Sequence, residues 1–291
     1  MKRTRREFLS EMSFLGAVAA VLGRPPLSAA DPAARRFRIG ACDWSVGKAA
    51  DPAAFAVAKG LGLEGVEVSC GMPGDRLPIS EADRRGKFLD AAKETGLAIP
   101  STCLEVLHRD GLKASEKGPK WVEEAIAPSK ELGARLILLP MFGDKAIEKR
   151  SEQKAVAERL KPIAKVAEKA GIVLGLENSI SAEDNAWILD QVGSPAVKVY
   201  YDVGNSFYEL GGRKPFDVYK EVAWLGKDRI GQIHLKERGP MGKGKIDFVR
   251  FAEAVLKTGF EGWIVLETSL KTMKEEAALA RDLFAAKKAG S

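Results

Sequence analysis

The chain of 291 residues is 45% hydrophobic and 30% charged, a balance typical of folded globular proteins, and this excludes an intrinsically disordered protein. Its three cysteines are too few for a small secreted scaffold held together by disulfides. The formal net charge of +6 would suit a protein that binds nucleic acid or an anionic membrane, so the position of that charge along the chain decides whether these functions remain open.

The first thirty residues carry half of the net charge, because they hold five basic and two acidic side chains. Within them, Thr4–Leu9 (TRREFL) resembles a twin-arginine export signal, in which paired arginines precede a mildly hydrophobic core. The apolar stretch Met12–Gly23 is too short to span a bilayer, and small residues follow it up to Ala30. We therefore predict a cleaved signal at residues 1–30, the twin-arginine export machinery as a partner, and a periplasmic or otherwise exported protein. A basic N-terminal helix that stays on the chain is the alternative.

Removal of the signal leaves a domain at residues 31–291 in which no basic, aromatic-rich surface remains, so we expect no nucleic acid as a partner. The run Ile39–Cys42 resembles a lipid-attachment motif, but arginines separate it from the apolar core of the signal. A buried strand fits this run better. We expect no stable membrane anchor.

After residue 36 the sequence repeats a short apolar run, a polar turn and an amphipathic stretch of helical period. Eight such units predict strands at 37–42, 65–69, 97–103, 135–139, 172–177, 197–202, 229–235 and 263–268. The predicted helices lie near 51–61, 80–95, 118–132, 151–170, 181–191, 215–225, 247–258 and 271–287. This strict alternation predicts an α/β fold with a single (β/α)8 TIM barrel, for which about 250 residues are typical. An open doubly wound sheet is the alternative, although no glycine-rich dinucleotide motif follows the first strand.

Local signals at the helices add detail to this pattern. Ser80, Ser181 and Asp247 precede helical stretches and are expected to cap them. Pro162 falls inside the predicted helix 151–170 and is expected to kink it or to divide it into two pieces.

Four consecutive strands in the second half end in potential metal ligands, which are Glu177, Asp202, His234 and Glu267. The carboxyl ends of barrel strands meet on one face, and neighbouring strands lie about 4.8 Å apart, so these side chains can converge on one ion. Three carboxylates and one imidazole favour Mn²⁺ or Mg²⁺, with Zn²⁺ or Co²⁺ as alternatives. The competing interpretation is that each residue simply ends a strand in a polar loop.

The segments LGLEN, YYDVGN, QIHLKE, GKGKIDF and GWIVLET together resemble the sugar phosphate isomerase/epimerase family of xylose-isomerase-like barrels. The resemblance implies one divalent metal ion held by Glu177, Asp202, His234 and Glu267. It also implies that Glu177 and Glu267 are catalytic, one removing a proton next to a carbonyl and the other returning it. Return to the same carbon inverts that carbon, and return to its neighbour converts an aldose into a ketose or the reverse.

The sequence departs from this family at two positions. Epimerases of the family usually carry a substrate-binding histidine three residues after the aspartate, where this chain has Asn205. They also carry an arginine six residues after the strand-seven histidine, where this chain has Pro240, with Arg238 nearby.

Other residues that follow strands are candidate substrate contacts. Besides Asn205, these are Trp44, Glu105, His108 and Lys236, each with packing or a solvated loop as the alternative. Asp43 could add an acceptor beside Trp44. Glu67 falls on the second strand, where the side of the strand that it faces is undetermined.

The resulting prediction is an enzyme, a metal-dependent isomerase or epimerase acting on a small-molecule sugar, with a homodimer left open. Export argues against a phosphorylated substrate and raises an alternative, a lyase that acts on 3-keto-glycosides by β-elimination at C1–C2. An endonuclease of the same superfamily is disfavoured because its zinc site needs many histidines and this chain has two. A sugar-binding protein without turnover is a further alternative.

Overall fold

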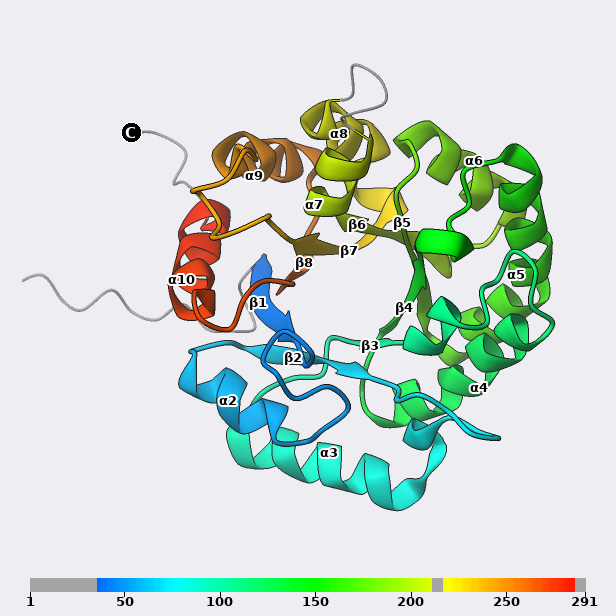
Figure 1. Ribbon diagram of the computed structural model, residues 1–291, viewed down its shortest axis with the longest axis horizontal. Coiled ribbons are helices and arrows are strands. Elements are labelled where there is room, and N and C mark those ends of the chain that lie inside the picture. The colour runs from blue at the N-terminus through cyan, green and yellow to red at the C-terminus, as the bar shows by residue number, and fades with distance from the viewer. Residues whose placement is uncertain (1–35, 211–216, 286–291) are drawn as a thin grey trace, which may run out of the picture. The chain divides into compact units, whose positions relative to one another are not determined.

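Eight parallel strands form a closed barrel in the computed structural model, which describes residues 36–210 and 217–285. Each strand pairs with the next one along the chain, and β1 pairs with β8 to close the ring (Figure 1). The strands are β1 (Phe37–Cys42), β2 (Gly65–Ser69), β3 (Ser101–Cys103), β4 (Leu136–Met141), β5 (Val173–Asn178), β6 (Val197–Asp202), β7 (Ile230–Leu235) and β8 (Gly262–Leu266). The predicted single (β/α)8 barrel is confirmed, and the open doubly wound sheet is wrong.

Helices lie around the outside of the barrel (Figure 1). The α-helices are α2 (Ala54–Gly60), α3 (Ala82–Thr95), α4 (Lys117–Glu131), α5 (Arg150–Ala170), α6 (Ala182–Val192), α7 (Val203–Asn205), α8 (Val218–Arg229), α9 (Phe248–Thr258) and α10 (Met273–Phe284). Shorter helical turns are η2 (Pro78–Ser80), η3 (Glu105–His108), η4 (Gly143–Lys145) and η5 (Ser206–Leu210). Each long helix returns the chain to the start of the next strand, so all strand carboxyl ends meet on one face.

Two prolines act differently from the prediction. The third strand starts at Ser101 rather than near residue 97, because Pro100 has no N–H to donate to a neighbouring strand. Pro162, in contrast, lies within one continuous helix, α5, and the prediction of two pieces is wrong. Its ring is on the exposed face of α5, where water can bind the carbonyl that loses its helical partner.

Two of the three predicted helix caps are confirmed. Ser181 Oγ accepts a hydrogen bond from the N–H of Asp184, and the Asp247 carboxylate accepts one from the N–H of Arg250. The prediction for Ser80 is wrong, because its hydroxyl donates to the carboxylate of Glu124 instead.

The barrel interior below the carboxyl-terminal face is packed with side chains. Cys103, Leu136, Leu138 and Tyr200 form a cluster separate from the large core between strands and helices. A Cβ atom at Gly175 would lie 3.0 Å from a Leu136 methyl group, so glycine leaves the room that Leu136 fills. The barrel is therefore solid beneath the face on which the ligands end.

Asp43 connects the loop after β1 to the end of β2. Its buried carboxylate accepts hydrogen bonds from Ser69 Oγ at 2.7 Å, from the Ser69 N–H at 2.7 Å and from the Ala50 N–H at 2.9 Å. Burial outweighs these bonds and raises the pKa of Asp43 to about 6. The sequence suggested a substrate acceptor here, but this carboxylate is occupied within the fold.

Asp43→Asn is expected to flatten the dependence of unfolding free energy on pH. The folded-state pKa lies above the unfolded one, so the contribution of Asp43 is complete below about pH 4 and falls by about 3 kcal/mol as pH rises through 6. An amide retains an acceptor for the two N–H groups and can donate to Ser69. Urea unfolding at several pH values between 4 and 8, in chelator, measures the slope. Asp43→Ala is the control and should lose stability at every pH, whereas an unchanged slope in Asp43→Asn contradicts the assignment.

No helix in the described ranges is long and apolar enough to cross a membrane. The predicted export signal at residues 1–30 lies outside the residues that the structure describes.

Candidate metal centre and active-site pocket

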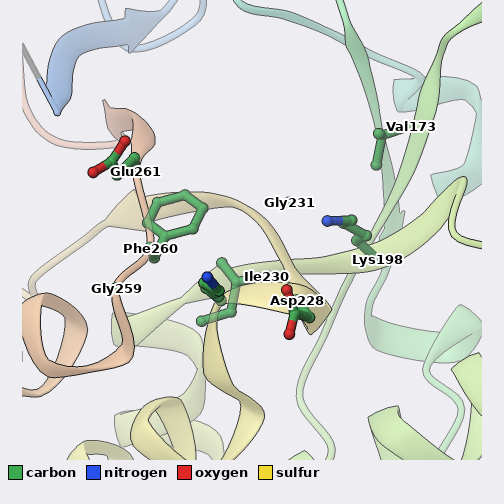
Figure 2. Close-up of a pocket in the computed structure, with 9 residues that line it drawn as sticks. Val173, Lys198, Asp228, Ile230, Gly231, Gly259, Phe260 and Glu261 are labelled. Atoms are coloured by element: carbon green, nitrogen blue, oxygen red, sulfur yellow. The ribbon is translucent and has the colours of Figure 1, made fainter.

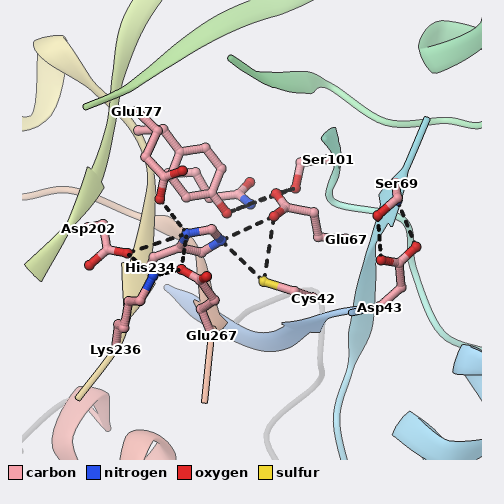
Figure 3. A network of polar contacts seen from close by, with 12 residues as sticks. Cys42, Asp43, Glu67, Ser69, Ser101, Glu177, Asp202, His234, Lys236 and Glu267 are labelled. Atoms are coloured by element: carbon pink, nitrogen blue, oxygen red, sulfur yellow. Dashed lines mark hydrogen bonds and ion pairs between the residues drawn. The ribbon is translucent and has the colours of Figure 1, made fainter. Parts of the chain in front are cut away.

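The barrel brings together the four side chains predicted to bind metal. Glu177 lies near the end of β5, Asp202 ends β6, His234 is on β7 and Glu267 directly follows β8 (Figure 3). Asp202 and His234 are directly paired in the register of β6 and β7. One ligand atom from each of the four residues lies within 4.8 Å of those from the other three.

The ring of His234 is oriented with Nδ1 toward the carboxylates. Nδ1 lies 2.8 Å from Glu177 Oε1, 3.6 Å from Glu267 Oε2 and 3.9 Å from Asp202 Oδ2. Burial alone would lower the pKa of His234, but negative neighbours, including Glu177, outweigh it and raise the pKa well above its usual value. Nδ1 is therefore the ring nitrogen that faces the space between the three carboxylates.

The electrostatics of the cluster fit a divalent cation. Burial raises the pKa of Asp202 well above its usual value, and repulsion from Glu267 and Glu177 raises it further. Asp202 Oδ2 is buried and has no hydrogen-bond partner. Three carboxylates this close are costly without positive charge between them, and carboxylate oxygens with one imidazole nitrogen suit a hard or borderline ion. Glu177, Asp202, His234 and Glu267 could therefore hold a metal ion.

Lys236 supplies a positive charge at the edge of this cluster. Its Nζ lies 2.9 Å from Glu267 Oε2 and 4.0 Å from Asp202 Oδ2. Burial acts to lower the pKa of Lys236, but these two carboxylates raise it above its usual value, so the ammonium stays charged. The same two cations, His234 and Lys236, outweigh burial and lower the pKa of Glu267.

Glu67, whose direction on the second strand could not be determined from the sequence, contacts the candidate ligand His234. It faces into the barrel, and its Oε1 lies 3.1 Å from His234 Nε2, on the side of the ring away from the carboxylates (Figure 3). Its Oε2 accepts hydrogen bonds from Tyr200 at 2.9 Å and from Ser101, and Gln232 donates to both of those hydroxyls. A carboxylate that accepts from Nε2–H leaves Nδ1 free for a metal ion and fixes the ring orientation.

Glu67→Gln is expected to weaken metal binding about 10- to 100-fold, because a neutral amide holds the imidazole less firmly and makes it a poorer ligand. Isothermal titration of the metal-free protein with Mn²⁺ measures this, and the visible spectrum of the Co²⁺ form reports any change in ligand geometry. Tyr200→Phe, which removes one hydrogen bond to Glu67 and no charge, is the matched control and should change affinity by only about threefold. Unchanged affinity in Glu67→Gln would show that Glu67 does not support the ligand.

Cys42 lies on the same side of the histidine as Glu67. Its Sγ is 3.4 Å from His234 Nε2 and 3.7 Å from Glu67 Oε1, so these three residues form a second close group of potential ligands. Burial raises the pKa of the Cys42 thiol well above its usual value, which disfavours the thiolate that a metal would need. We interpret the thiol as part of the hydrogen-bonded support of His234. Cys70 and Cys103 are likewise buried and free.

A pocket of about 440 Å³ opens beside the four ligands. Its walls are largely apolar, with Trp44, Met72 and Phe142 among them, and both Glu177 and Glu267 border it. All five predicted substrate contacts line it, and these are Trp44, Glu105, His108, Asn205 and Lys236.

Glu105 presents an unpaired oxygen in this pocket. Its Oε1 accepts a hydrogen bond from the N–H of Gly71 at 2.7 Å, while Oε2 is buried without a partner. Burial raises the pKa of Glu105 to about 7, so near neutral pH the carboxyl can accept or donate a hydrogen bond. Arg238, in contrast, does not line the pocket, because its guanidinium pairs with Glu209 at 3.1 Å.

A larger cavity of about 540 Å³ lies at the opposite end of the barrel (Figure 2). Lys198 and Lys227 line it together with Asp228 and Glu261. Lys198 is four residues before Asp202 on the same strand, which separates the cavity from the metal ligands by roughly 13 Å. Size alone therefore does not mark the functional site of this molecule.

The fold is a TIM barrel in which carboxylates and an imidazole converge at the carboxyl ends of the strands, the face that carries the active site in enzymes of this fold. Residues 55–287 match the family described as xylose isomerase-like TIM barrel, and the chain belongs to that family of sugar epimerases and isomerases.

Individual relatives agree with this assignment. L-ribulose-5-phosphate 3-epimerase UlaE from Escherichia coli is 27% identical over 259 residues, which cover 80% of this chain and 88% of the relative. The structure of 3-keto-D-glucoside 4-epimerase YcjR from E. coli has a TM-score of 0.64 at 18% identity and covers 84% of this chain and 99% of YcjR. D-allulose 3-epimerase from Methylomonas sp. in complex with D-allulose has a TM-score of 0.64 at 22% identity, covering 81% and 85%. The two solved structures support the shared fold.

Proposed function

We propose that the protein is a divalent-metal-dependent sugar isomerase or epimerase that removes and returns a proton next to a carbonyl. The observation that carries the proposal is the pair Glu177 and Glu267, which flank the candidate metal site and border one pocket. They come from β5 and from the end of β8, with β6 and β7 between them in the ring. The two carboxylates therefore approach a bound substrate from different sides.

The residues of the site divide the work of such a reaction. A bound Mn²⁺ or Mg²⁺ would supply positive charge for the oxygens of the carbonyl and of the adjacent hydroxyl. Glu267 is kept ionised by His234 and Lys236, which suits it to take the proton from carbon. Burial raises the pKa of Glu177, which suits it to return a proton from the other side. The apolar wall around Trp44 would limit the access of water to the carbon that has lost its proton.

The charge of the pocket favours a neutral sugar. Among the described residues that line it, Lys236 is the one permanent cation, and Lys236 is already paired with Glu267. Glu105, Glu177 and Glu267 add negative charge. The substrate name of UlaE includes a phosphate, and the described residues of this pocket provide no unpaired lysine or arginine to bind one.

Elimination from a 3-keto-glycoside is the second candidate reaction. The same glutamates would remove the proton at C2, the electron pair would form a C1–C2 double bond, and the C1–O bond would break to release the substituent as an alcohol after protonation. The charge of the pocket favours this candidate as much as the first, because both substrates are uncharged.

Deuterium exchange tests both reactions together. Protein stripped by a chelator and reloaded with Mn²⁺, Mg²⁺, Co²⁺ or Zn²⁺ is incubated in D2O with free ketoses and with methyl 3-keto-glucoside, and products are followed by NMR. Metal-dependent deuterium incorporation with a new epimer or isomer supports the first reaction. Release of methanol without ketose conversion supports the second. Absence of both deuterium exchange and methanol release with every sugar would overturn both reactions and favour a binding protein without turnover.

Export and assembly are separate proposals. We propose that residues 1–30 direct the chain out of the cytoplasm through the twin-arginine machinery, on the strength of the paired Arg5 and Arg6. Replacing both arginines by lysine is expected to leave the full-length protein in the cytoplasm, as measured by cell fractionation with a cytoplasmic marker as control. Export of the double variant would contradict the signal.

A homodimer is the proposed assembly, which sedimentation at several concentrations checks.

A further inference from the structure

A second cavity of about 410 Å³ adjoins the metal pocket on the same face of the barrel. Phe142 and Asn205 line both cavities, so the two share a wall. The second cavity extends away from the metal ligands over the segments that follow β4, β5 and β6, and Ala146, Ser179 and Glu209 line it there. None of these last three residues lines the metal pocket.

The polar groups of this second cavity suit hydroxyl groups. Ser179 Oγ is buried and has no hydrogen-bond partner in the fold, so a ligand can supply one. Asn205 offers an amide with both a donor and an acceptor, and Glu209 adds a carboxylate at the edge of the cavity. The ring of Phe142 adds an apolar wall of the kind that carries the C–H face of a sugar.

The described residues around the cavity disfavour an anionic occupant. Within residues 36–210 and 217–285, neither lysine nor arginine lines it, and two of the lining residues are carboxylates. The nearby Arg238 is exposed and paired with Glu209, so it compensates that carboxylate rather than serving a ligand. A phosphate or carboxylate group in this cavity would lose hydration without gaining an ion pair.

The geometry points to a second sugar subsite, so that the substrate is a neutral glycoside whose reacting ring carries a ketone and lies at the metal centre, with its substituent beside Ser179. This inference rests on the proposed function for the position of the reacting ring. Two cavities of this size together fall within the roughly 300–1,000 Å³ range of small-molecule sites. The substituent is a second sugar or another hydroxyl-rich group.

The test separates the two cavities with one variant in each. Ala146 lines only the second cavity, and Ala49 lines only the metal pocket. Ala146→Trp therefore places an indole in the second cavity, and Ala49→Trp places one in the metal pocket. For Ala146→Trp, the ratio of kcat/KM for a 3-keto-disaccharide to that for methyl 3-keto-glucoside is expected to fall about 10- to 100-fold, mainly through KM. Ser179→Ala should lower the same ratio about three- to tenfold. Ala49→Trp should lower both values and leave the ratio nearly constant.

Equal losses for both substrates in Ala146→Trp, or no change in the ratio, would overturn the subsite. Replacement of the second sugar by a phosphate-bearing substituent distinguishes the chemistry, because faster turnover of the phosphate would overturn the neutral class. Calorimetric binding of an unoxidised disaccharide and of methyl glucoside to the metal-loaded protein gives a readout without turnover. If no sugar reacts but the disaccharide binds more tightly and Ala146→Trp removes that advantage, the proposed reaction fails and the subsite stands.

Discussion

Replacing Glu267 by glutamine is expected to lower kcat about 10²- to 10⁴-fold, the range in which a positioned acid or base contributes to a proton transfer. Glutamine keeps the shape of the side chain, and its amide oxygen can still accept the hydrogen bond from Lys236. It cannot hold the proton taken from carbon. The loss should therefore appear in kcat, and the rate of deuterium incorporation into the substrate should fall by the same factor.

The control for this prediction is Glu261→Gln. Glu261 is exposed, pairs with Arg36 and lies at the opposite end of the barrel, so the same chemical change there should leave kcat unaltered. Metal content of Glu267→Gln is measured in parallel, since a variant that has lost its metal would mimic the loss of a base. Full activity in a metal-loaded Glu267→Gln protein would remove this residue from the reaction and strengthen the case for a binding protein without turnover.

The sequence predicted the fold and the convergence of the four candidate ligands for one physical reason, which is that strictly alternating strands and helices force all strand carboxyl ends onto one face. Asp202, His234 and Glu267 end neighbouring strands, so their convergence follows once the barrel is assumed. Apart from the β1–β8 pair that closes the ring, each strand pairs with its neighbour in sequence, so little long-range pairing had to be predicted.

Glu67 could not be placed in the same way. It is the central residue of the five-residue strand β2, in which both faces are buried, so the alternation of Val66 and Val68 with Glu67 and Ser69 does not tell which face points into the barrel. Its inward position is set by the register that pairs it with Cys42, a contact between strands that the sequence does not encode locally. One signal was present: a lone carboxylate in an otherwise apolar strand needs a partner, and His234 supplies one.

The arrangement of side chains in the pocket could not be predicted from the sequence either. Trp44, Glu105 and Asn205 come from three different segments after their strands, and irregular segments carry no periodic signal. The sequence could name them as candidates because each follows a strand. It could not show that the carboxylate of Asp43, adjacent to Trp44, already accepts hydrogen bonds from Ser69 and Ala50 within the fold.

Asp202→Asn is expected to change stability in opposite directions with and without metal, and to abolish activity. Without metal, the buried Asp202 carboxylate is repelled by Glu177 and Glu267, and its raised pKa means that its contribution to stability is lost as pH rises. The amide removes that cost and can still accept the N–H of Asn205, which the carboxylate binds at 2.8 Å. The metal-free variant should therefore be more stable than the metal-free wild type at neutral pH.

With metal, the order reverses. An ion present at 100 times its Kd stabilises the wild type by about 2.7 kcal/mol, and a variant with a neutral, weaker ligand at this position loses most of that gain and about 10³-fold or more of the activity. Thermal unfolding with chelator and with a titration of Mn²⁺ measures both arms. Asp247→Asn is the matched control, because asparagine caps a helix as well as aspartate and Asp247 lies outside the ligand cluster, so neither arm should move. Equal metal-induced stabilisation of Asp202→Asn and wild type would contradict the ligand assignment, whereas lower stability of the metal-free variant would contradict the repulsion between the carboxylates.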